Sequence, residues 1–306
     1  MTTDTTLATV EETTEWVSEN GHEFYTHLYK STVQPPKATV TFVHGLSEHT
    51  DRYEDLARYF ARAGIQVIGF DQRGFGRTGQ KDGKLGHNQG IQNVLDDLAA
   101  MNKRVSVDGV PHFLFGHSMG GFISLKFCSE RNKDGHVKGV VSSAPALRPG
   151  KTTQPPKIVE IILKQIVKVA PSIKKESGID VEHLTDNQAE LDKFNASPLN
   201  LSYCSLGTMA DIYFGGLKLI KEAGSFSTPV YLIHADGDMA TDCEGTQEFF
   251  GKLSQDLDKH FEHVKGCKYH EIHFQEDLDI DLPKTYTQWI LQRIGNSTQS
   301  TVDTAN

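Results

Sequence analysis

The sequence lacks several features that would assign it to particular protein classes. Its 306 residues include four cysteines, and these show neither a C-x-x-C pair nor the spacing of a metal site. It contains no run of about 18 apolar residues, so no membrane-spanning segment is predicted. The polar, acidic start has neither the basic flank nor the apolar stretch of a secretory signal. We therefore expect a reduced, cytoplasmic protein without a metal.

The charge balance is acidic, with a formal net charge of -9 at pH 7. This balance argues against a nucleic-acid partner, because proteins that bind nucleic acid usually carry a basic patch or stripe. Apolar residues make up 37% of the chain and charged residues 23%, which is typical of a packed core rather than of disorder. No feature of the composition predicts an oligomeric state.

Apolar runs typical of strands alternate with helical periodicity along most of the chain. The predicted strands are 38–45, 65–71, 112–118, 137–146, 229–235 and 259–266, and the predicted helices are 51–64, 93–105, 120–130, 243–255 and 282–294. This alternation indicates an α/β fold, with a mostly parallel central sheet and helices on both faces. In such sheets, functional groups lie in loops at the carboxyl ends of strands.

Residues 148–226 interrupt the alternation, contain a Pro-Pro pair near their start, and show only helical patterns. We predict that they form a helical cap inserted into the sheet domain. The two parts of the sheet domain would then be residues 20–147 and 227–295. Residues 1–19 and 296–306 are predicted to be flexible termini.

The stretch "FLFGHSMGG" contains the pattern G-x-S-x-G between a predicted strand and a predicted helix. That context is typical of a nucleophile elbow, in which a sharp turn exposes a serine at the top of the sheet. We expect Ser118 to be the nucleophile. Gly116, His117 and Gly120 would build the turn, and the backbone N–H of Met119 would face a developing oxyanion. The alternative is a chance Gly-Ser-Gly loop.

A serine nucleophile requires a histidine base, and a carboxylate must orient that histidine. In this fold the order along the chain is serine, acid, histidine. His260 and His263 lie within a predicted strand, whereas His270 and His273 follow it. We expect His270 to be the base of Ser118 and His273 to be a neighbouring loop residue.

The turn "HG" at residues 44–45 ends the first strongly apolar strand. Next to a nucleophile elbow, the backbone N–H of Leu46 would supply the second donor of an oxyanion hole. The alternative is a simple glycine turn.

The stretch "RGFGRTG" contains G-x-G-x-x-G from Gly74 to Gly79, a pattern found in dinucleotide sites. In a true site the glycines open a helix, whereas the following "QKDGKLG" has the composition of a loop. We therefore expect no dinucleotide cofactor, with Asp71 and Arg73 anchoring the loop.

The motifs "HGLSEHTDRY", "FDQRGFGRTG", "GHSMGG", "HADGD" and "YHEIH" together resemble the α/β-hydrolase family, and specifically its monoacylglycerol lipase group. The resemblance extends from about residue 26 to residue 294 and is weak in the cap. It implies an α/β-hydrolase fold and cofactor-free hydrolysis of monoacylglycerol to fatty acid and glycerol.

The same resemblance implies the site residues. Ser118 matches the family's nucleophile, His270 its base, and Leu46 and Met119 its oxyanion-hole donors. In the family two residues stand between "HG" and the acid, which selects Asp238 among the aspartates of "VYLIHADGDMATD". Asp236 is then expected to form a turn, and Asp242 to cap the next helix. This chain departs from the family in having Ala235 for the usual glycine and a loop before His270 that is one residue longer.

The segment "KIVEIILKQIVKVAP" combines a lysine stripe (Lys157, Lys164 and Lys168) with apolar residues at helical spacing. Residues expected to line a lid or contact substrate are Ile158, Ile162, Leu163 and Ile166. One interpretation is a helix that transiently contacts a membrane or lipid-droplet surface; the other is an ordinary cap helix packed on the site. The family resemblance favours membrane contact.

Two other functions remain open from the sequence. A related carboxylesterase or lysophospholipase would use the same three catalytic residues, because substrate choice depends on the cap. A non-catalytic α/β-hydrolase relative would act as a binding module, although such proteins usually lose a member of the triad.

Overall fold

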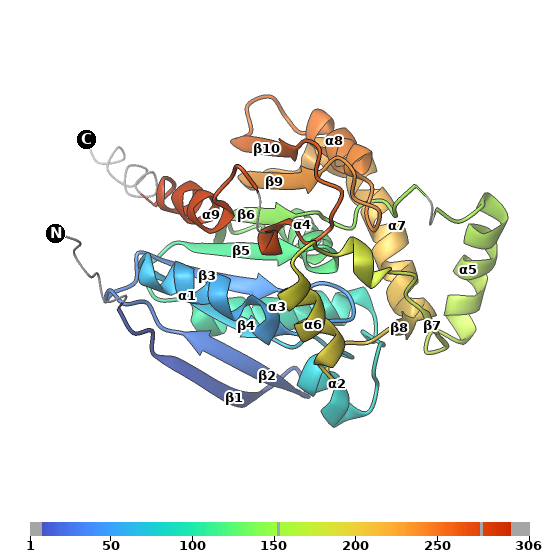
Figure 1. Cartoon of the computed structure of the whole chain (residues 1–306), viewed down its shortest axis with the longest axis horizontal. Helices are drawn as coiled ribbons and strands as arrows, with labels where there is room; N and C mark the ends of the chain where they lie inside the picture. Colours follow the sequence, from blue (N-terminus) through green and yellow to red (C-terminus); the bar gives the residue numbers. More distant parts are fainter. Residues whose placement is uncertain (1–7, 152–153, 276–277, 295–306) are drawn as a thin grey trace.

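The computed structural model describes residues 8–151, 154–275 and 278–294, which are built around an eight-stranded sheet (Figure 1). The strand order is β1-β2-β4-β3-β5-β6-β9-β10. Neighbours from β4 to β10 run parallel, whereas β2 is antiparallel to β1 and to β4. The bounds are Glu12–Glu19 (β1), His22–Tyr29 (β2), Ala38–Val43 (β3), Ile65–Phe70 (β4), His112–His117 (β5), Val137–Ser143 (β6), Val230–Ala235 (β9) and Lys259–Val264 (β10). The predicted mostly parallel sheet is confirmed.

Helices cover both faces of this sheet, as predicted. One buried cluster joins the sheet to α1 (Glu54–Arg62) and α9 (Leu282–Leu291). The other joins it to α3 (Ile91–Val105), α4 (Met119–Glu130) and α8 (Cys243–Lys252). Side chains along β5 alternate between the clusters, with Leu114 in one and Phe113 and Phe115 in the other. This alternation is the period of two that a strand imposes.

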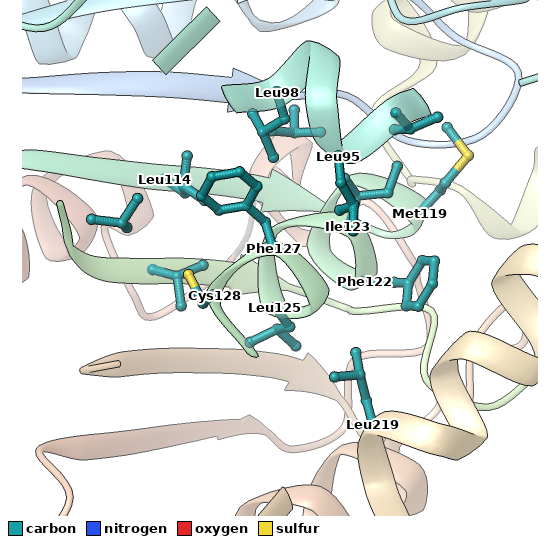
Figure 2. Close-up of a cluster of buried hydrophobic side chains, with 14 of the residues drawn as sticks. Leu95, Leu98, Leu114, Met119, Phe122, Ile123, Leu125, Phe127, Cys128 and Leu219 are labelled. Carbon is teal, nitrogen blue, oxygen red and sulfur yellow. The ribbon is translucent and has the colours of Figure 1, made fainter. Parts of the chain in front are cut away.

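Helix α4 lies at the centre of the second cluster (Figure 2). Every residue from Met119 to Cys128 is buried, so this stretch of the helix has no side that faces solvent. Phe122 packs near Leu219 of α7 (Leu206–Glu222), and Ile123 lies near Leu95 of α3. The first turn of α4, which follows Ser118, is therefore held by dense packing on all sides.

The prediction of a flexible segment over residues 1–19 is wrong for residues 12–19, which form β1. This strand is joined to β2 by a two-residue turn in which Asn20 and Gly21 have φ of 51° and 69°. Asn-Gly is a strong hairpin signal because both residues tolerate positive φ. The hairpin was not predicted, because β1 is polar and buries little besides Val17. The predicted flexible residues 1–7 and 296–306 lie outside the described residues.

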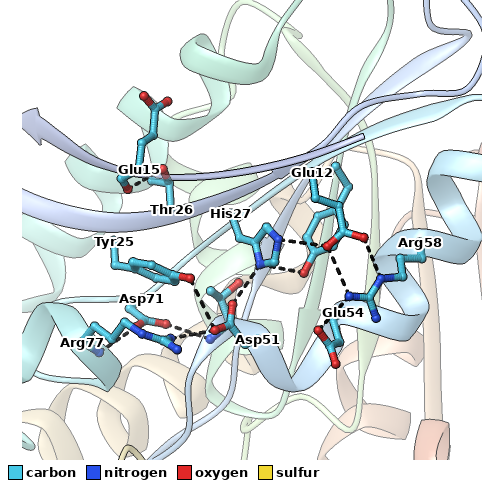
Figure 3. A network of polar contacts seen from close by, with 12 residues as sticks. Glu12, Glu15, Tyr25, Thr26, His27, Asp51, Glu54, Arg58, Asp71 and Arg77 are labelled. Atoms are coloured by element: carbon cyan, nitrogen blue, oxygen red, sulfur yellow. Dashed lines mark hydrogen bonds and ion pairs between the residues drawn. The ribbon is translucent and has the colours of Figure 1, made fainter. Parts of the chain in front are cut away.

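A polar network fastens this hairpin to the rest of the molecule (Figure 3). The His27 ring lies between Glu12, at 3.2 Å, and Asp51, at 3.0 Å. Asp51 belongs to the 3₁₀ helix η1 (Thr50–Tyr53) and also pairs with Arg77 at 2.7 Å. The hairpin is thus bonded to the segment that follows β3.

Residues 148–226 lie between β6 and β9 in the sequence, and those of them that the structure describes lie at the arrowhead end of the sheet (Figure 1). We call them the cap segment. They contain α5 (Lys157–Val169), β7 (Lys174–Glu176), η2 (Val181–His183), α6 (Gln188–Ala196), β8 (Tyr203–Ser205), α7 and η3 (Ala223–Ser225). The expectation of helices only is wrong, because β7 and β8 pair as a small antiparallel sheet. Strands of three residues are too short to show a period in the sequence.

The loop expected after "RGFGRTG", at residues 80–86, is wrong for residues 80–82, because Gly76–Asp82 forms the short helix α2. Residues 83–86 form a loop as expected. The Asp71 carboxylate accepts the N–H of Arg77 at 2.7 Å and that of Thr50 at 2.8 Å. The helix start, where a dinucleotide phosphate would bind, is thus filled by a carboxylate. Arg73 pairs with buried Asp97 at 3.0 Å, so Asp71 and Arg73 anchor the loop as predicted.

Over the described ranges, we find no helix whose length and apolar character would let it cross a bilayer.

The packing around α3 yields a stability prediction. Leu98 is fully buried in the cluster of Figure 2, so Leu98→Ala should lower the free energy of unfolding by about 2–5 kcal/mol. The matched control on the same helix is exposed Lys103, whose replacement by Ala should change it by less than about 0.5 kcal/mol. Urea unfolding of both variants checks the difference, and equal losses would contradict this assignment of the core.

Candidate active site

Ser118 occupies a sharp turn between β5 and α4. Its φ of 52° and ψ of -117° are unusual for a residue with a side chain. The neighbouring glycines make the turn possible. A Cβ on Gly116 would lie 2.3 Å from the carbonyl oxygen of Gly120, and one on Gly120 would lie 1.9 Å from that of Val43. The strand, turn and helix that the motif requires are all present.

His270 and Asp238 are joined by a short hydrogen bond, with His270 Nδ1 2.6 Å from Asp238 Oδ2. Asp238 lies in the loop after β9, and His270 lies in the loop after β10. The same carboxylate oxygen accepts from the Thr241 hydroxyl at 2.9 Å and lies 3.0 Å from His234 Nε2. Its other oxygen accepts the N–H of Ala240 at 2.8 Å. Asp238 is therefore fixed in one orientation, with Nδ1 of His270 bound to it.

The electrostatics favour an ionised Asp238 and a basic His270. Burial alone would raise the pKa of Asp238, but His270 and His234 outweigh it and hold that pKa well below its usual value. Burial would likewise lower the pKa of His270, but the charge and hydrogen bond of Asp238 raise it above the ordinary value of 6.5. His270 thus holds a proton more readily than an isolated histidine.

The other two aspartates of this loop have structural contacts. Asp236 accepts the N–H of Gly266 at 3.0 Å, between the loops after β9 and β10. Asp242 caps α8 by accepting the N–H of Glu244 at 3.1 Å, and it pairs with Arg148 at 2.8 Å. Of the three, Asp238 is the one bonded to His270.

Leu46 lies in the loop after β3 and faces the same space as Ser118. The preceding Gly45 is pressed against the serine, since a Cβ there would lie 3.3 Å from Ser118 Cβ. The Gly45 N–H donates to the Glu48 carboxylate. The N–H of Gly45 is thus already bonded, and the bond fixes the loop that carries Leu46. Met119, the other predicted donor, is the first residue of α4.

A buried cluster of Glu48, Arg52 and Glu271 connects this loop to the base, and it was missed in the sequence. Arg52 contacts both carboxylates at 2.5 Å, and the three side chains are almost fully buried. Burial would raise the pKa of Glu48, but Arg52 lowers it on balance. Because Glu271 follows His270, the cluster holds the loop after β3 and the base loop together. The spacing E-x-x-x-R within "HGLSEHTDRY" was its one signal.

Two further imidazoles lie near the base, His117 against His270 and His273 against His117. The rings of His117 and His270 are 4.6 Å apart, and those of His117 and His273 are 4.8 Å apart. Burial lowers the pKa of His273 to about 3 and that of His117 well below its ordinary value. Both are therefore much weaker bases than His270, whose pKa is raised, so neither competes with it for the proton of Ser118. His273 is a packed neighbour of the site, and His260 and His263 lie in β10, as expected.

Two cavities meet at Ser118. The larger has a volume of about 540 Å³ and is lined mainly by apolar side chains, including Ile162, Leu163 and Ile166 of α5. Ile158, predicted to line a lid or contact substrate, is not among the residues that line this cavity and is 62% exposed. The smaller cavity, of about 210 Å³, is bordered by His270 and by several polar side chains. Leu46 and Ser118 line both.

Among the described residues, no group of three or more His, Cys, Asp or Glu side chains is arranged to hold a metal ion. The site is built from the chain's own nucleophilic, basic and acidic groups.

Comparison with known proteins assigns the chain to a family. A family model described as serine aminopeptidase, S33, matches residues 34–277. The chain belongs to this family. A putative monoglyceride lipase of Schizosaccharomyces pombe is 30% identical over 260 residues, which cover 84% of this chain and 68% of that protein. An abhydrolase domain-containing protein of Dictyostelium discoideum is 31% identical over 86% of this chain, but the match spans 27% of its length.

Among solved structures, a monoacylglycerol lipase of Paleococcus ferrophilus superimposes with a TM-score of 0.78. It is 27% identical, and the match covers 89% of this chain and 99% of that one. The family member described here therefore has the predicted α/β-hydrolase fold, and its resemblance to monoacylglycerol lipases is confirmed.

The Asp238–His270 pair yields a prediction for pH dependence. A general base works when neutral, so kcat/KM for a soluble ester should fall as pH drops through the raised His270 pKa, above about 6.5. Asp238→Asn should lower kcat by roughly 10³–10⁴-fold and move this inflection to lower pH. The matched controls Asp236→Asn and Asp242→Asn should leave the inflection in place. An unchanged profile in Asp238→Asn would contradict the pairing.

Proposed function

We propose that this protein is a serine hydrolase that cleaves monoacylglycerol to a free fatty acid and glycerol through an acyl-enzyme on Ser118. The observation that carries the proposal is the meeting of two unlike cavities at one serine. The larger, apolar cavity suits an acyl chain, and the smaller, more polar one suits an alcohol. The named relative from Schizosaccharomyces pombe and the Paleococcus ferrophilus structure support the same substrate class.

In the first half of the reaction, the Ser118 hydroxyl attacks the ester carbonyl and His270 Nε2 accepts its proton. Asp238 binds Nδ1, which leaves Nε2 as the acceptor, and its charge stabilises the imidazolium that forms. The N–H groups of Leu46 and Met119 receive the oxyanion of the tetrahedral intermediate. Removing one such donor typically costs about 3–4 kcal/mol of transition-state stabilisation. The imidazolium then protonates the departing glycerol oxygen, and the C–O bond breaks.

In the second half, water enters from the polar side and attacks the acyl-enzyme. His270 takes a proton from this water and returns it to Ser118 as the fatty acid departs. Three side chains and two backbone N–H groups thus carry the reaction, and no cofactor takes part in any step.

A test of the nucleophile is Ser118→Ala. Removing the hydroxyl should lower hydrolysis of a monoacylglycerol by at least about 10⁴-fold, and it should abolish labelling by a fluorophosphonate. Circular dichroism should match the wild type, because the methyl group leaves the turn intact. A folded Ser118→Ala protein that still hydrolyses monoacylglycerol and still reacts with the fluorophosphonate would overturn the assignment of Ser118 as the nucleophile. A wild type that cleaves short-chain esters or lysolipids but no monoacylglycerol would instead favour the rival carboxylesterase or lysophospholipase.

We further propose that α5 makes transient contact with a membrane or lipid-droplet surface. No residue of α5 is buried, and Ile161 is 58% exposed. The outward side chains Ile158 and Ile161 would enter the interface, while Ile162 and Ile166 line the larger cavity. The three lysines of the stripe do not share one environment, because Lys164 Nζ lies 4.7 Å from the centre of the Phe214 ring of α7. Exposed apolar side chains beside a cavity mouth support delivery of a lipid from its surface.

Two neighbouring substitutions separate membrane contact from substrate contact. Ile161→Asp should lower partitioning to phospholipid vesicles by about tenfold and leave hydrolysis of a soluble ester unchanged. Ile162→Asp should impair hydrolysis of long-chain esters, because it puts a charge into the larger cavity. Co-sedimentation and soluble-ester assays measure the two effects. Unchanged partitioning of a folded Ile161→Asp protein would defeat the idea.

A further inference from the structure

The loop that carries Asp238 is bounded by two buried side chains that contact each other. His234 lies near the end of β9, and Thr246 lies in the first turn of α8. Both are 0% exposed, and His234 Nδ1 lies 2.8 Å from Thr246 Oγ1. The other ring nitrogen, Nε2, lies 3.0 Å from Asp238 Oδ2. The imidazole of His234 therefore lies between α8 and the carboxylate that binds His270.

The contacts of this ring fix which of its nitrogens carries the proton. An ionised carboxylate can only accept hydrogen bonds, so His234 Nε2 must donate to Asp238. Nδ1 is then the acceptor of the neutral ring, and the Thr246 hydroxyl donates to it. A continuous chain of hydrogen bonds thus runs from Thr246 through His234 and Asp238 to His270.

His234 differs from most other donors to Asp238 in the element that carries it. Oδ2 lies within hydrogen-bond distance of His270, His234 and the Thr241 hydroxyl, and Oδ1 accepts the N–H groups of Ala240 and Thr241. Ala240 and Thr241 belong to the same loop as Asp238. His234 belongs to β9, which is paired with β6 on one side and β10 on the other. It therefore ties the carboxylate to the sheet itself.

We propose that His234 is a positioning residue for the reaction, which acts through Asp238 as a second imidazole on the carboxylate that orients His270. This proposal rests on the proposed hydrolysis of an ester at Ser118. The N–H of His234 holds Oδ2 in line with His270 Nδ1 and stabilises part of the negative charge of the carboxylate. His270 moves a proton to and from the reacting groups, whereas His234 keeps its proton throughout.

The effect of His234 on His270 has a definite sign. Burial lowers the pKa of His270, but the charge and hydrogen bond of Asp238 outweigh it. Without the N–H of His234, more of the negative charge of Asp238 would act on His270 and would raise that pKa further. Asp238→Asn removes the charge and has the opposite effect.

The other ionisable groups near His270 are Glu48 and Glu271, which share Arg52, and the imidazoles of His117 and His273. In the described part of the chain none of them is bonded to His234, whose ring contacts Asp238, Thr241 and Thr246. A change at His234 therefore reaches His270 through Asp238.

The test replaces His234 by Phe, which removes both ring nitrogens and keeps a ring of similar size. The acid limb of kcat/KM for p-nitrophenyl butyrate should move to higher pH by about 0.5–1 unit. On the alkaline plateau kcat should fall by about ten- to hundredfold. His234→Gln keeps a side-chain N–H near the position of Nε2 and should restore the wild-type inflection. An inflection that stays in place or moves to lower pH in a folded His234→Phe protein would overturn the inference.

The matched control is His112→Phe, which removes another buried imidazole. His112 lies at the start of β5, at the opposite end of the strand from Ser118, and its Nδ1 lies 2.9 Å from Thr39 Oγ1. Its loss should lower the melting temperature and leave the inflection in place. A shift as large as that of His234→Phe would show that losing any buried histidine moves the profile, and this would overturn the inference.

A double variant removes the charge through which His234 would act. In an Asp238→Asn background, His234→Phe should change kcat/KM by less than about threefold, because the effects of two residues that act as a unit do not add. A loss as large as in the wild-type background would overturn the inference, since His234 would then act on a group other than Asp238.

Nitrogen-15 NMR of labelled histidine gives a readout that does not depend on activity. At about pH 8, His234 of the wild type should have a protonated Nε2 and an unprotonated Nδ1, with its signals assigned by their loss in His234→Gln. The reverse tautomer in an active enzyme would overturn this inference alone. A wild type with the expected tautomer but without esterase activity would instead overturn the proposed function.

Discussion

The site depends on the left-handed backbone of Ser118. A non-glycine residue in such a conformation costs about 1–3 kcal/mol and persists only where its surroundings enforce it. Here the enforcement comes from packing: β5 enters through Gly116, and α4 is buried from Met119 to Cys128. Because Gly120 lies against the Val43 carbonyl, the elbow and the end of β3 approach closely. The loop that carries Leu46 is thereby brought beside the serine.

Buried charge organises the remainder of the site. Asp238 is ionised because it is surrounded by donors, and its charge keeps His270 more basic than the neighbouring imidazoles of His117 and His273. Arg52 plays a comparable role on the other side, where it neutralises part of the charge of Glu48 and Glu271. Glu48 fixes the loop after β3, and Glu271 directly follows His270. The cluster therefore holds the loop that carries Leu46 in position relative to the loop that carries His270.

The cap segment has two distinct relations to this centre. Residues 183 and 184 accept the backbone N–H groups of His270 and Glu271 at 3.0 and 2.7 Å, so part of the cap is bonded directly to the base loop. Helix α5, by contrast, buries none of its residues and divides its apolar side chains between a cavity and the surface. One part of the cap segment is therefore bonded to the loop beside the smaller cavity. Another part, α5, is an exposed apolar helix beside the larger cavity.

The sequence by itself determined the alternation of strands and helices and the elbow around Ser118, because these depend on local periodicity and on a motif. The choice of Asp238 among three neighbouring aspartates came from the family resemblance. The sequence did not reveal the Asn20-Gly21 hairpin, whose polar strand shows no apolar period, or the pair β7–β8, whose strands are too short to have one. Only the tertiary structure brought Glu48, Arg52 and Glu271 together and closed two unlike cavities around one serine. Those features join residues from the sheet loops and the cap, and long-range packing sets their spacing.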